Sequence, residues 1–370
     1  LVYSEVIEFI KEQDTIKGVK VLDHHTGIVT DYYAPVTVNA GGIWGHHIAQ
    51  MAGANISMFP AKGALLIFAH RVNSVVINRC RKPANADILV PGDTVCVIGT
   101  TSTRVPYEEC DHLKVTPDEV DLLLTEGAKL APCLAETRVL RAYAGVRPLV
   151  SADNDPSGRN ISRGIVCLDH ETRDGIKGFI SITGGKLMTY RLMGEMAADA
   201  VCKKLGRDAK CVTAYTPLPG SEPGGIEEIS KKIWEVPTMV QKASVGRFGT
   251  QAANLDFDGD VKGSLVCECE EVSVSEVDSA IENLEVNNLV DLRRRTRFGM
   301  GTCQGELCAC RAAGRLAKAR KCTAKARADL KDFMDERWKG MYPVAWGETL
   351  RESAYTQWVY SEVMGLGEEI

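Results

Sequence analysis

Four cysteines in two close pairs place the strongest constraint on how this chain can fold. Cys267 and Cys269 have one residue between them. Cys303 and Cys308 have four residues between them, and 33 residues separate the two pairs. Either the chain brings these thiols together to hold an inorganic group, or they are small buried residues that happen to cluster. The sequence between the pairs indicates whether they can meet.

Two short helices are predicted between the pairs. Ser273 and Glu276 have the spacing of a capping box, and Asn288 can begin the second helix. The apolar residues after the capping box share one helical face: Val277, Ala280, Ile281 and Leu284. A helical hairpin of this length returns the chain to its start, so the two pairs can converge on one point. Cys308 would then begin a third helix, whose backbone N–H groups and dipole favour negative charge.

Four thiolates can hold zinc or a [2Fe–2S] cluster. Zinc-binding turns favour ligands about two to four residues apart, and a one-residue gap is awkward for such a turn. An oxidised cluster with four thiolates carries a charge of roughly −2. Five basic residues are well placed to offset it: Arg293, Arg294, Arg295, Arg297 and Arg311. A solvated face or a site for an acidic partner is the alternative for these arginines. The pattern favours an iron–sulfur cluster over zinc or ordinary core residues, with Cys310 and Cys322 as bystanders.

Length and composition are typical of a globular protein with two or three domains. The chain has 370 residues, of which 45% are hydrophobic and 25% charged. Its net charge of −5 gives no support to a general role in nucleic-acid binding. The longest apolar run is about six residues, whereas a membrane-spanning helix needs roughly 20. Thirteen cysteines without a secretory signal predict a reducing compartment. Because the chain opens directly with Leu1 in an amphipathic stretch, we expect its true N-terminus to be missing.

A strand, a tight turn and a helix are predicted near the middle of the chain. Residues 178–182 form the strand, residues 183–186 the turn, and residues 187–205 the helix. Two glycines in the turn let the backbone approach a ligand closely, and the first helical N–H groups can face a negative or electron-rich atom. A simple turn is the alternative. The helix is apolar on nearly all sides, so we expect it to be mostly buried.

Two sets of motifs resemble known families. "CECEE" followed by "GMGTCQGELCACRAAG" resembles the bacterioferritin-associated-ferredoxin-type [2Fe–2S] domain. "VTVNAGGIW", "YAGVRPL" and "GGKLMTYR", in that order, resemble the FAD-dependent glycerol-3-phosphate dehydrogenases of the D-amino-acid-oxidase-like class. With the tail "ERWKGMYPVAWGETLRES", the resemblance sharpens to the anaerobic, multi-subunit branch of that family. It covers essentially the whole chain.

The resemblance implies a set of site residues. The implied cluster ligands are Cys267, Cys269, Cys303 and Cys308. Residues implied near the nucleotide portion of FAD are Ala40, Gly41 and Gly42. Residues implied at the isoalloxazine and ribityl end are Gly184, Gly185, Lys186 and Leu187. Arg147 and Arg163 would hold the substrate phosphate, which suits the planar fork of an arginine.

The implied fold class is α/β (α+β). It combines a partial FAD-binding domain of two or three layers, a substrate domain with an antiparallel sheet, and a small helical [2Fe–2S] domain. The expected FAD-binding parts are residues 1–55 and 146–210, on either side of a substrate-binding β domain at 56–145. The expected C-terminal parts are a linker with helices at 211–262, the [2Fe–2S] domain at 263–325, and an aromatic tail for partner docking at 326–370.

Two departures from the family pattern limit the assignment. The Gly-x-Gly-x-x-Gly unit that holds the FAD pyrophosphate is absent from this sequence, which fits the expectation of a missing N-terminal part. Leu65 stands where the aerobic relatives carry a histidine, so the catalytic base is unassigned. His70 is near in sequence but lies on the opposite strand face from Leu65. Three other residues are no better supported as the base: His46, His47 and Tyr143.

The implied activity is oxidation of sn-glycerol 3-phosphate to dihydroxyacetone phosphate. Electrons would pass through FAD and the [2Fe–2S] cluster to partner subunits of a membrane-associated complex and indirectly to a quinone. The implied location is the cytoplasm, with attachment to the inner face of the cell membrane through those partners. One alternative is part of a flavin-dependent amine or amino-acid dehydrogenase, and another is a non-catalytic electron-transfer module.

Overall fold

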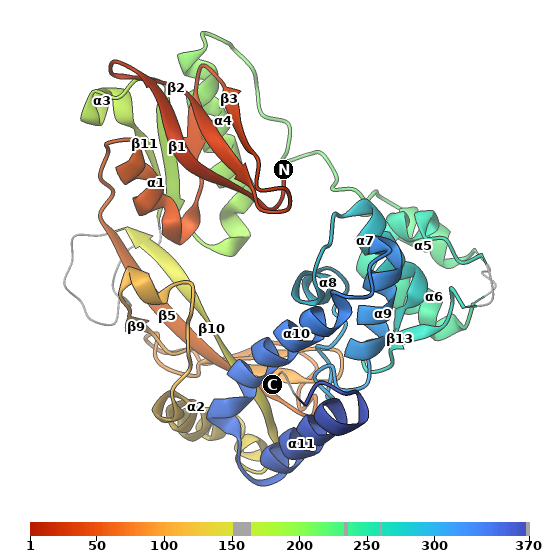
Figure 1. The fold of residues 1–370 in the computed structure, drawn as a ribbon. Helices are drawn as coiled ribbons and strands as arrows, with labels where there is room; N and C mark the ends of the chain where they lie inside the picture. The colour runs from red at the N-terminus through yellow and green to blue at the C-terminus, as the bar shows by residue number, and fades with distance from the viewer. Residues whose placement is uncertain (151–163, 233–235, 259–260, 368–370) are drawn as a thin grey trace. The chain divides into compact units, whose positions relative to one another are not determined.

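The computed structural model describes residues 1–150, 164–232, 236–258 and 261–367, which form two compact units (Figure 1). Unit 1 comprises residues 1–63, 102–113 and 145–216. Unit 2 comprises residues 64–101, 114–144 and 217–370. Strands β5 (Met58–Phe68) and β10 (Val139–Val150) run along the chain from one unit into the other. The mixture of sheets and helices confirms the predicted α/β (α+β) class.

Unit 1 is built on two three-stranded sheets. The first is an antiparallel meander of β1 (Ser4–Glu12), β2 (Thr15–Asp23) and β3 (Val29–Tyr33). The second places β12 (Phe179–Gly184) between β11 (Ile165–Asp169), which is antiparallel to it, and β4 (Thr37–Asn39), which is parallel. A short strand, β9 (Thr103–Arg104), pairs with Ala61 and Lys62 of β5. The turn at residues 24–26 joins β2 to β3.

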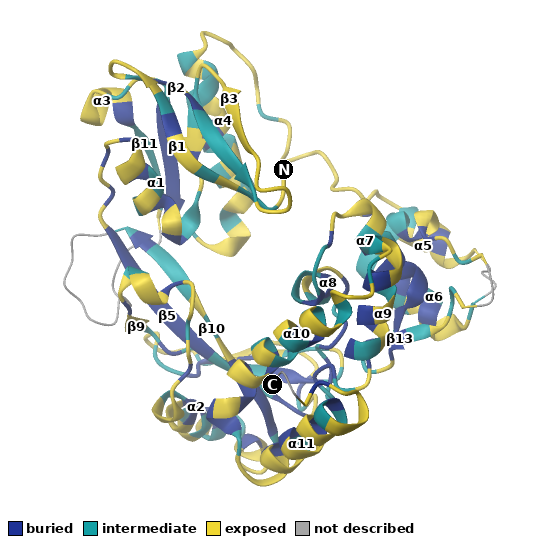
Figure 2. Ribbon diagram, in the orientation of Figure 1, coloured by how far each residue is buried: buried dark blue, intermediate teal, exposed yellow. Residues whose placement is uncertain are grey.

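A buried histidine ties the second sheet to a short helix. His170 begins α3 (His170–Asp174), and its ring stacks on Phe179 of β12 with 4.6 Å between ring centroids. Its two ring nitrogens lie 2.6 Å from Asp174 Oδ2 and 2.8 Å from Ser181 Oγ. Since both nitrogens have partners within the core, this histidine serves the fold. Figure 2 shows β12 buried along most of its length.

Two further helices of unit 1 follow strands. Helix α1 (Gly45–Met51) comes after β4, and α4 (Tyr190–Lys204) comes after β12 and a single 3₁₀ turn at Leu187–Thr189. The prediction that the second of these is mostly buried was wrong, because only Ala197 in α4 is fully buried. The apolar face of α4 borders a pocket, so an apolar pattern here indicates a pocket wall and not a packed core.

Unit 2 begins with an antiparallel sheet covered by a helix. Leu65–Phe68 of β5 pairs with β8 (Cys96–Gly99), which pairs with β7 (Ile88–Pro91), and β6 (Ile77–Asn78) lies at the edge. Helix α2 (Pro117–Leu130) packs on this sheet, with Leu123 and Val120 in the shared core. Thr116 and Glu119 form a capping box at the N-terminus of this helix.

The rest of unit 2 is mainly helical. Its helices are α5 (Gly225–Ser230), α6 (Thr238–Phe248), α7 (Val274–Asn283), α8 (Leu289–Thr296), α9 (Ala309–Arg320), α10 (Ala326–Met341) and α11 (Gly347–Trp358). A two-stranded ribbon of β13 (Leu265–Cys267) and β14 (Val272–Ser273) precedes α7. One apolar core joins this ribbon to α7–α10 and includes Val277, Leu292 and Phe333.

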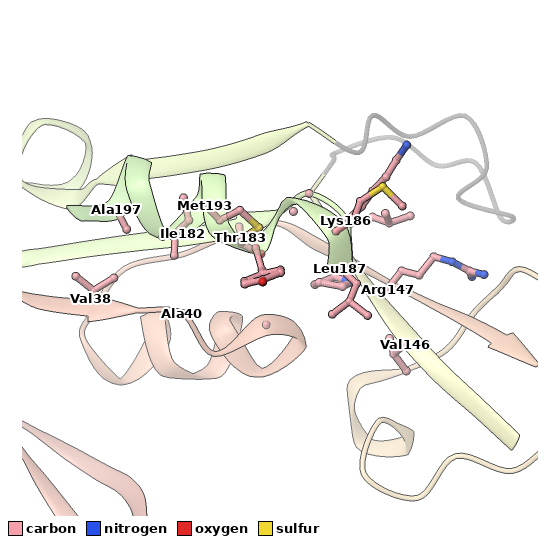
Figure 3. Close-up of a pocket in the computed structure, with 18 residues that line it drawn as sticks. Val38, Ala40, Val146, Arg147, Ile182, Thr183, Lys186, Leu187, Met193 and Ala197 are labelled. Carbon is pink, nitrogen blue, oxygen red and sulfur yellow. The ribbon is translucent and has the colours of Figure 1, made fainter. Parts of the chain in front are cut away.

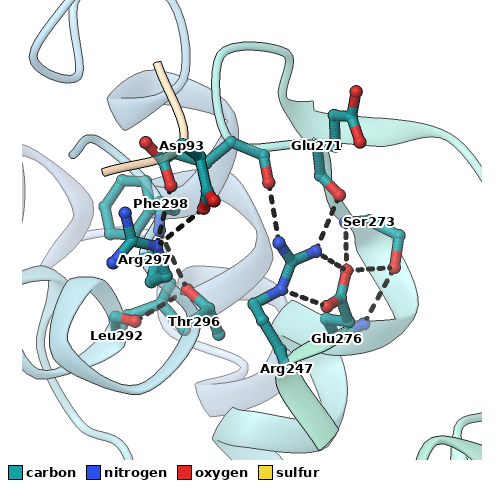
Figure 4. A network of polar contacts seen from close by, with 10 residues as sticks. Asp93, Arg247, Glu271, Ser273, Glu276, Leu292, Thr296, Arg297 and Phe298 are labelled. Atoms are coloured by element: carbon teal, nitrogen blue, oxygen red, sulfur yellow. Dashed lines mark hydrogen bonds and ion pairs between the residues drawn. The ribbon is translucent and has the colours of Figure 1, made fainter. Parts of the chain in front are cut away.

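A buried ion pair holds α6 against the start of α7 (Figure 4). Arg247 of α6 contacts both carboxylate oxygens of Glu276, at 2.7 and 3.0 Å, and Glu276 also caps α7 through Ser273. The same guanidinium donates to the backbone carbonyls of Glu270 and Glu271, each at 2.8 Å. The Glu276 side chain is fully buried, so one arginine holds both the helix cap and the loop that precedes it.

Replacing Arg247 by methionine should destabilise unit 2 by about 3–5 kcal/mol, because the change leaves a buried carboxylate and two carbonyls without their partner. Urea unfolding followed by circular dichroism measures the difference. The control is Arg351→Ala, which breaks an exposed pair with Glu348 and should cost under ~0.5 kcal/mol. Equal effects of the two changes would contradict this account.

Candidate cofactor sites

The four cysteines that the sequence singled out meet in unit 2. Cys267 ends β13, and Cys308 is the N-cap of α9. The Cys303 side chain interacts with those of Cys269 and Cys308, and the Cys267 side chain interacts with that of Cys308. The two pairs therefore form one continuous group of sulfur atoms. The structure also bears out the helices predicted between the pairs, with Asn288 as the N-cap of α8.

Thiol contacts shift the acidity of these cysteines in opposite directions. The hydrogen bonds from Cys269 and Cys308 lower the pKa of Cys303, and the contact from Cys308 lowers that of Cys267. The same contacts raise the pKa of the two donors.

Backbone groups around the sulfurs suit an anionic cluster. Cys267 accepts from the backbone N–H groups of Gly299 and Glu270, and Cys303 accepts from those of Leu307 and Gly305. Hydrogen bonds from N–H groups to ligating sulfurs are a main way in which a protein stabilises an iron–sulfur cluster. Among the described residues, no group of three or more His, Cys, Asp or Glu side chains is already arranged to hold a metal ion. The donor set and its N–H groups fit a [2Fe–2S] cluster.

Glycines allow the second cysteine loop to lie close to the first. A Cβ atom on Gly301 would come within 2.3 Å of Cys269 Cβ, so a larger residue cannot occupy that position without moving the ligand. Gly299 and Gly305 both have positive φ, at 71° and 94°, and both lie against the ring of Phe333. The glycine-rich segment therefore serves close packing around the thiols.

The arginines predicted to offset the cluster charge are used in different ways. The pKa of Arg311 is raised chiefly by its pair with Glu268 and further by Cys308 and Cys267, so this arginine faces the thiols while it is paired with a carboxylate. For Arg293 the charge offset stays a prediction; its pKa is lowered to about 9 by burial and by the neighbouring Arg141.

The remaining arginines of the run have carboxylate partners or face solvent. Arg294 pairs with Asp291 at 3.0 Å, and Arg297 pairs with Glu270 at 2.8 Å. Arg295 is exposed. This basic run therefore also forms ion pairs with carboxylates, one on its own helix and one on the loop after β13.

Unit 1 contains a pocket of about 810 Å³ at the carboxyl ends of β4 and β12 (Figure 3). Its lining includes six of the residues expected to contact FAD: Ala40, Gly42, Gly184, Gly185, Lys186 and Leu187. Gly41 lies beside them in the sequence. A Cβ atom on Gly41 would be only 2.4 Å from Cδ1 of Ile48, so the position has no room for a side chain. The walls are mainly apolar, with Val38, Met193 and Ala197 at the end shown on the left of Figure 3.

Polar groups in the pocket lie where a ligand can use them. Arg147 and Lys186 lie at the end opposite Val38 and Ala197 (Figure 3). Thr183 is buried, and its hydroxyl has no hydrogen-bond partner among the described residues. A buried hydroxyl without a partner is costly unless a ligand or water contacts it. The pocket therefore fits a large, mostly planar cofactor with polar groups along one edge.

Gly63 positions Arg147, a relationship that the sequence did not reveal. The Arg147 guanidinium makes long hydrogen bonds to the backbone carbonyls of Ala61 and Lys62, at 3.5 and 3.4 Å. A Cβ on Gly63 would lie 2.4 Å from one of its terminal nitrogens. The glycine thus lets the guanidinium lie flat against β5. Arg163, the second arginine expected to hold phosphate, lies outside the described residues.

The histidines considered as catalytic bases are not in the pocket. His46 contacts the Ile56 carbonyl at 2.8 Å and stacks on Tyr107, as expected for a structural residue. His47 meets the edge of the same ring, and His70 is an exposed residue of unit 2. None of the described residues that line the pocket is a histidine or a carboxylic acid. The catalytic base stays unassigned.

Comparison with known proteins supports both sites. Residues 1–191 match the family of FAD dependent oxidoreductases, and residues 265–316 match the BFD-like [2Fe-2S] binding domain. The second match confirms the predicted [2Fe–2S] domain. A solved structure of glycerol-3-phosphate dehydrogenase from Bacillus halodurans complexed with FAD has a TM-score of 0.70 and 22% identity, covering 92% of this chain and 69% of that one. At this identity the likeness shows the fold alone.

Three curated relatives are A subunits, by name, of anaerobic glycerol-3-phosphate dehydrogenases. The Haemophilus influenzae protein is 57% identical over 99% of this chain and 65% of its own length. The Escherichia coli protein is 57% identical over the whole of this chain and 68% of its own length. The Haloferax volcanii protein is 36% identical over 99% of this chain and 64% of its own length. The chain thus spans about two thirds of the length of the relatives it matches.

Serine at any one of the four cysteine positions should abolish stable cluster binding, because a hydroxyl is a poor ligand for iron at neutral pH. Iron and sulfide content and the visible absorbance of anaerobically purified protein measure the loss. Cys310→Ser and Cys322→Ser are matched controls within the same domain and should retain the cluster. Full retention in Cys269→Ser, or zinc in place of iron in the unchanged protein, would contradict the assignment.

Proposed function

Because the chain belongs to the FAD-dependent oxidoreductase family, and within it to the A subunits of anaerobic glycerol-3-phosphate dehydrogenase, we propose that it oxidises sn-glycerol 3-phosphate to dihydroxyacetone phosphate. The observation that carries the proposal is 57% identity over the whole chain. When bound, FAD would accept the hydride that leaves the alcohol carbon. A [2Fe–2S] cluster would then carry the electrons one at a time.

Arg147 binds the substrate phosphate in this proposal. It lines the pocket, and Gly63 leaves room for its guanidinium against β5. The planar fork of arginine can make two parallel hydrogen bonds to phosphate oxygens. Its contacts with the Ala61 and Lys62 carbonyls limit its motion, so the phosphate would be held in a defined orientation. The family resemblance implies that Arg163 is a second ligand of the phosphate.

The other pocket residues orient the cofactor and exclude water. Gly184 and Gly185 have positive φ and carry no side chain, so the backbone of the turn can approach a flat ring closely. Backbone N–H groups in the turn that begins at Lys186 can stabilise negative charge on a reduced ring. The apolar wall of Met193 and Ala197 lies at the end of the pocket opposite Arg147 and offers apolar surface to the cofactor.

We further propose that partner subunits accept the electrons from the cluster. The relatives are named as subunits of a larger enzyme, which supports the existence of partners. In the described part of the chain, no helix has the length and hydropathy needed to cross a membrane. Attachment to the inner face of the cell membrane would then depend on those partners, which would pass electrons to a quinone. The exposed aromatic residues of the last two long helices and the segment between them are the proposed docking surface: Trp338, Tyr342, Trp346, Tyr355 and Trp358.

Glycerol 3-phosphate should bleach the flavin absorbance of the anaerobic protein, and an EPR signal of a reduced [2Fe–2S] cluster should follow. The order reflects two-electron chemistry at the flavin followed by one-electron transfer. Glycerol and inorganic phosphate, each added alone, are the controls. Bleaching by an amino acid or amine but not by glycerol 3-phosphate would favour an amine or amino-acid dehydrogenase. A protein that holds the cluster but no flavin would favour an electron-transfer module.

Arg147→Lys should lower kcat/KM for glycerol 3-phosphate about 10- to 100-fold, since a hydrogen bond to a charged group contributes roughly 1.5–3 kcal/mol. Gly63→Ala should raise KM by about 3- to 10-fold, because the new methyl group displaces the guanidinium while leaving the fold intact. Gly145→Ala is the control on β10, where a Cβ meets open space. Steady-state kinetics with a dye acceptor give these values, and an unchanged KM in Gly63→Ala would exclude this role for Arg147.

A further inference from the structure

The loop that carries Cys303 and Cys308 is held by helices that follow the matched [2Fe–2S] domain. That domain ends at residue 316, whereas α10 and the segment after α11 contact residues 299–306. Three buried side chains make the contacts: Phe333, Arg337 and Tyr360. They belong to one apolar core with the cluster domain or border it directly. The C-terminal helices therefore form part of the cluster site.

Arg337 is the charged member of this group. It is only 7% exposed, and its Nε donates to the backbone carbonyl of Gln304, beside Cys303, at 3.0 Å. A terminal nitrogen donates to Thr356 Oγ1 at 3.4 Å. Both hydrogen bonds end on neutral oxygens. The acidic groups that face the guanidinium are Glu306, Tyr360, Cys303 and Glu352.

The other two contacts are uncharged and set the shape of the loop. Tyr360 donates from its hydroxyl to the backbone carbonyl of Glu306 at 2.6 Å and is 1% exposed. The Phe333 ring occupies the space that Cβ atoms on Gly299 and Gly305 would need. These two residues and Arg337 thus contact the cysteine loop at three points, and only one of the three adds charge.

The charge of Arg337 differs in effect from that of the other arginines near the thiols. Arg311 and Arg297 form close pairs with Glu268 and Glu270, so each contributes little net charge at a distance. Arg337 is buried and remains protonated, since a guanidinium does not lose its proton in proteins. Reduction takes a [2Fe–2S] cluster from roughly −2 to −3 in charge. A buried cation in a region of low dielectric stabilises the more negative state.

We propose that Arg337 is a positioning residue that raises the reduction potential of the [2Fe–2S] cluster and, with Tyr360, fixes the loop of Cys303 and Cys308. The role rests on the cluster and not on the identity of the substrate. Failure of glycerol 3-phosphate to reduce the protein would therefore leave it standing.

An EPR-monitored redox titration of the anaerobically purified holoprotein tests the charge. Arg337→Gln should shift the cluster to a lower midpoint potential, whereas Arg337→Lys should keep it close to the wild-type value. Tyr360→Phe should leave the potential unchanged and speed the loss of iron to a chelator, because it removes a loop contact without removing charge. Arg320→Gln is the matched control, since Arg320 pairs with Asp329 at 2.6 Å and lies about 18 Å along α9 from Cys308.

An unchanged midpoint potential in Arg337→Gln would overturn the proposal, as would a shift of equal size in Arg320→Gln. If Arg337→Gln fails to assemble the cluster, the Arg337→Lys variant tests whether the positive charge is what matters. Assembly at the wild-type potential with lysine would support the need for positive charge. Failure of both variants to assemble would show a purely structural role and would overturn the assignment of the potential to Arg337.

Discussion

The convergence of four sulfur atoms from two distant segments is the constraint on which the C-terminal half of this protein depends. The thiols can meet only if α7 and α8 return the chain to β13, and the Ser273–Glu276 cap fixes where that return begins. Arg247 then fastens the cap to α6 through a fully buried carboxylate. The ribbon, the helical hairpin and the loop of glycines are thus consequences of one requirement, which is to place the two cysteine pairs within bonding distance of the same inorganic core.

The site in unit 1 obeys a different rule, because its ligand is expected to be large and only partly charged. Its walls are apolar, and its polar groups are the N–H groups of a turn, one buried hydroxyl at Thr183 and the cations at one end. In such a pocket the buried apolar surface provides most of the binding energy. A few directed polar contacts set the orientation of the ligand. Each site is built from residues of a single unit, the pocket from unit 1 and the thiols from unit 2. Substitutions in one should therefore leave the local geometry of the other intact.

Local signals made much of this predictable from sequence. Some features depend only on contacts within about one helical turn, so the local sequence predicts them. They are the capping boxes at Thr116 and Ser273 and the start of a helix at Cys308. The prediction that the helix after β12 is mostly buried was wrong. Apolar residues that line a pocket and apolar residues that fill a core have the same sequence pattern. Two contacts could not be predicted from the sequence: that of Gly63 with Arg147, and that of Arg337 with the cysteine loop. Both contacts join residues far apart in the chain, and neither leaves a periodic or spaced signal.

The fate of the arginine run shows why charge near a cluster cannot be inferred from sequence proximity. An arginine lowers the energy of an anionic cluster only if no carboxylate lies closer, since a paired guanidinium presents a dipole and not a net charge. Arg294 has such a carboxylate on its own helix and Arg297 has one on the loop after β13, whereas the hydrogen bonds of Arg337 end on neutral oxygens. Burial then increases the difference, because an exposed charge is screened by water and salt and a buried one is not. Arg337 acts on the redox centre in our proposal because its hydrogen bonds end on neutral oxygens, although Glu306 and Glu352 also face its guanidinium.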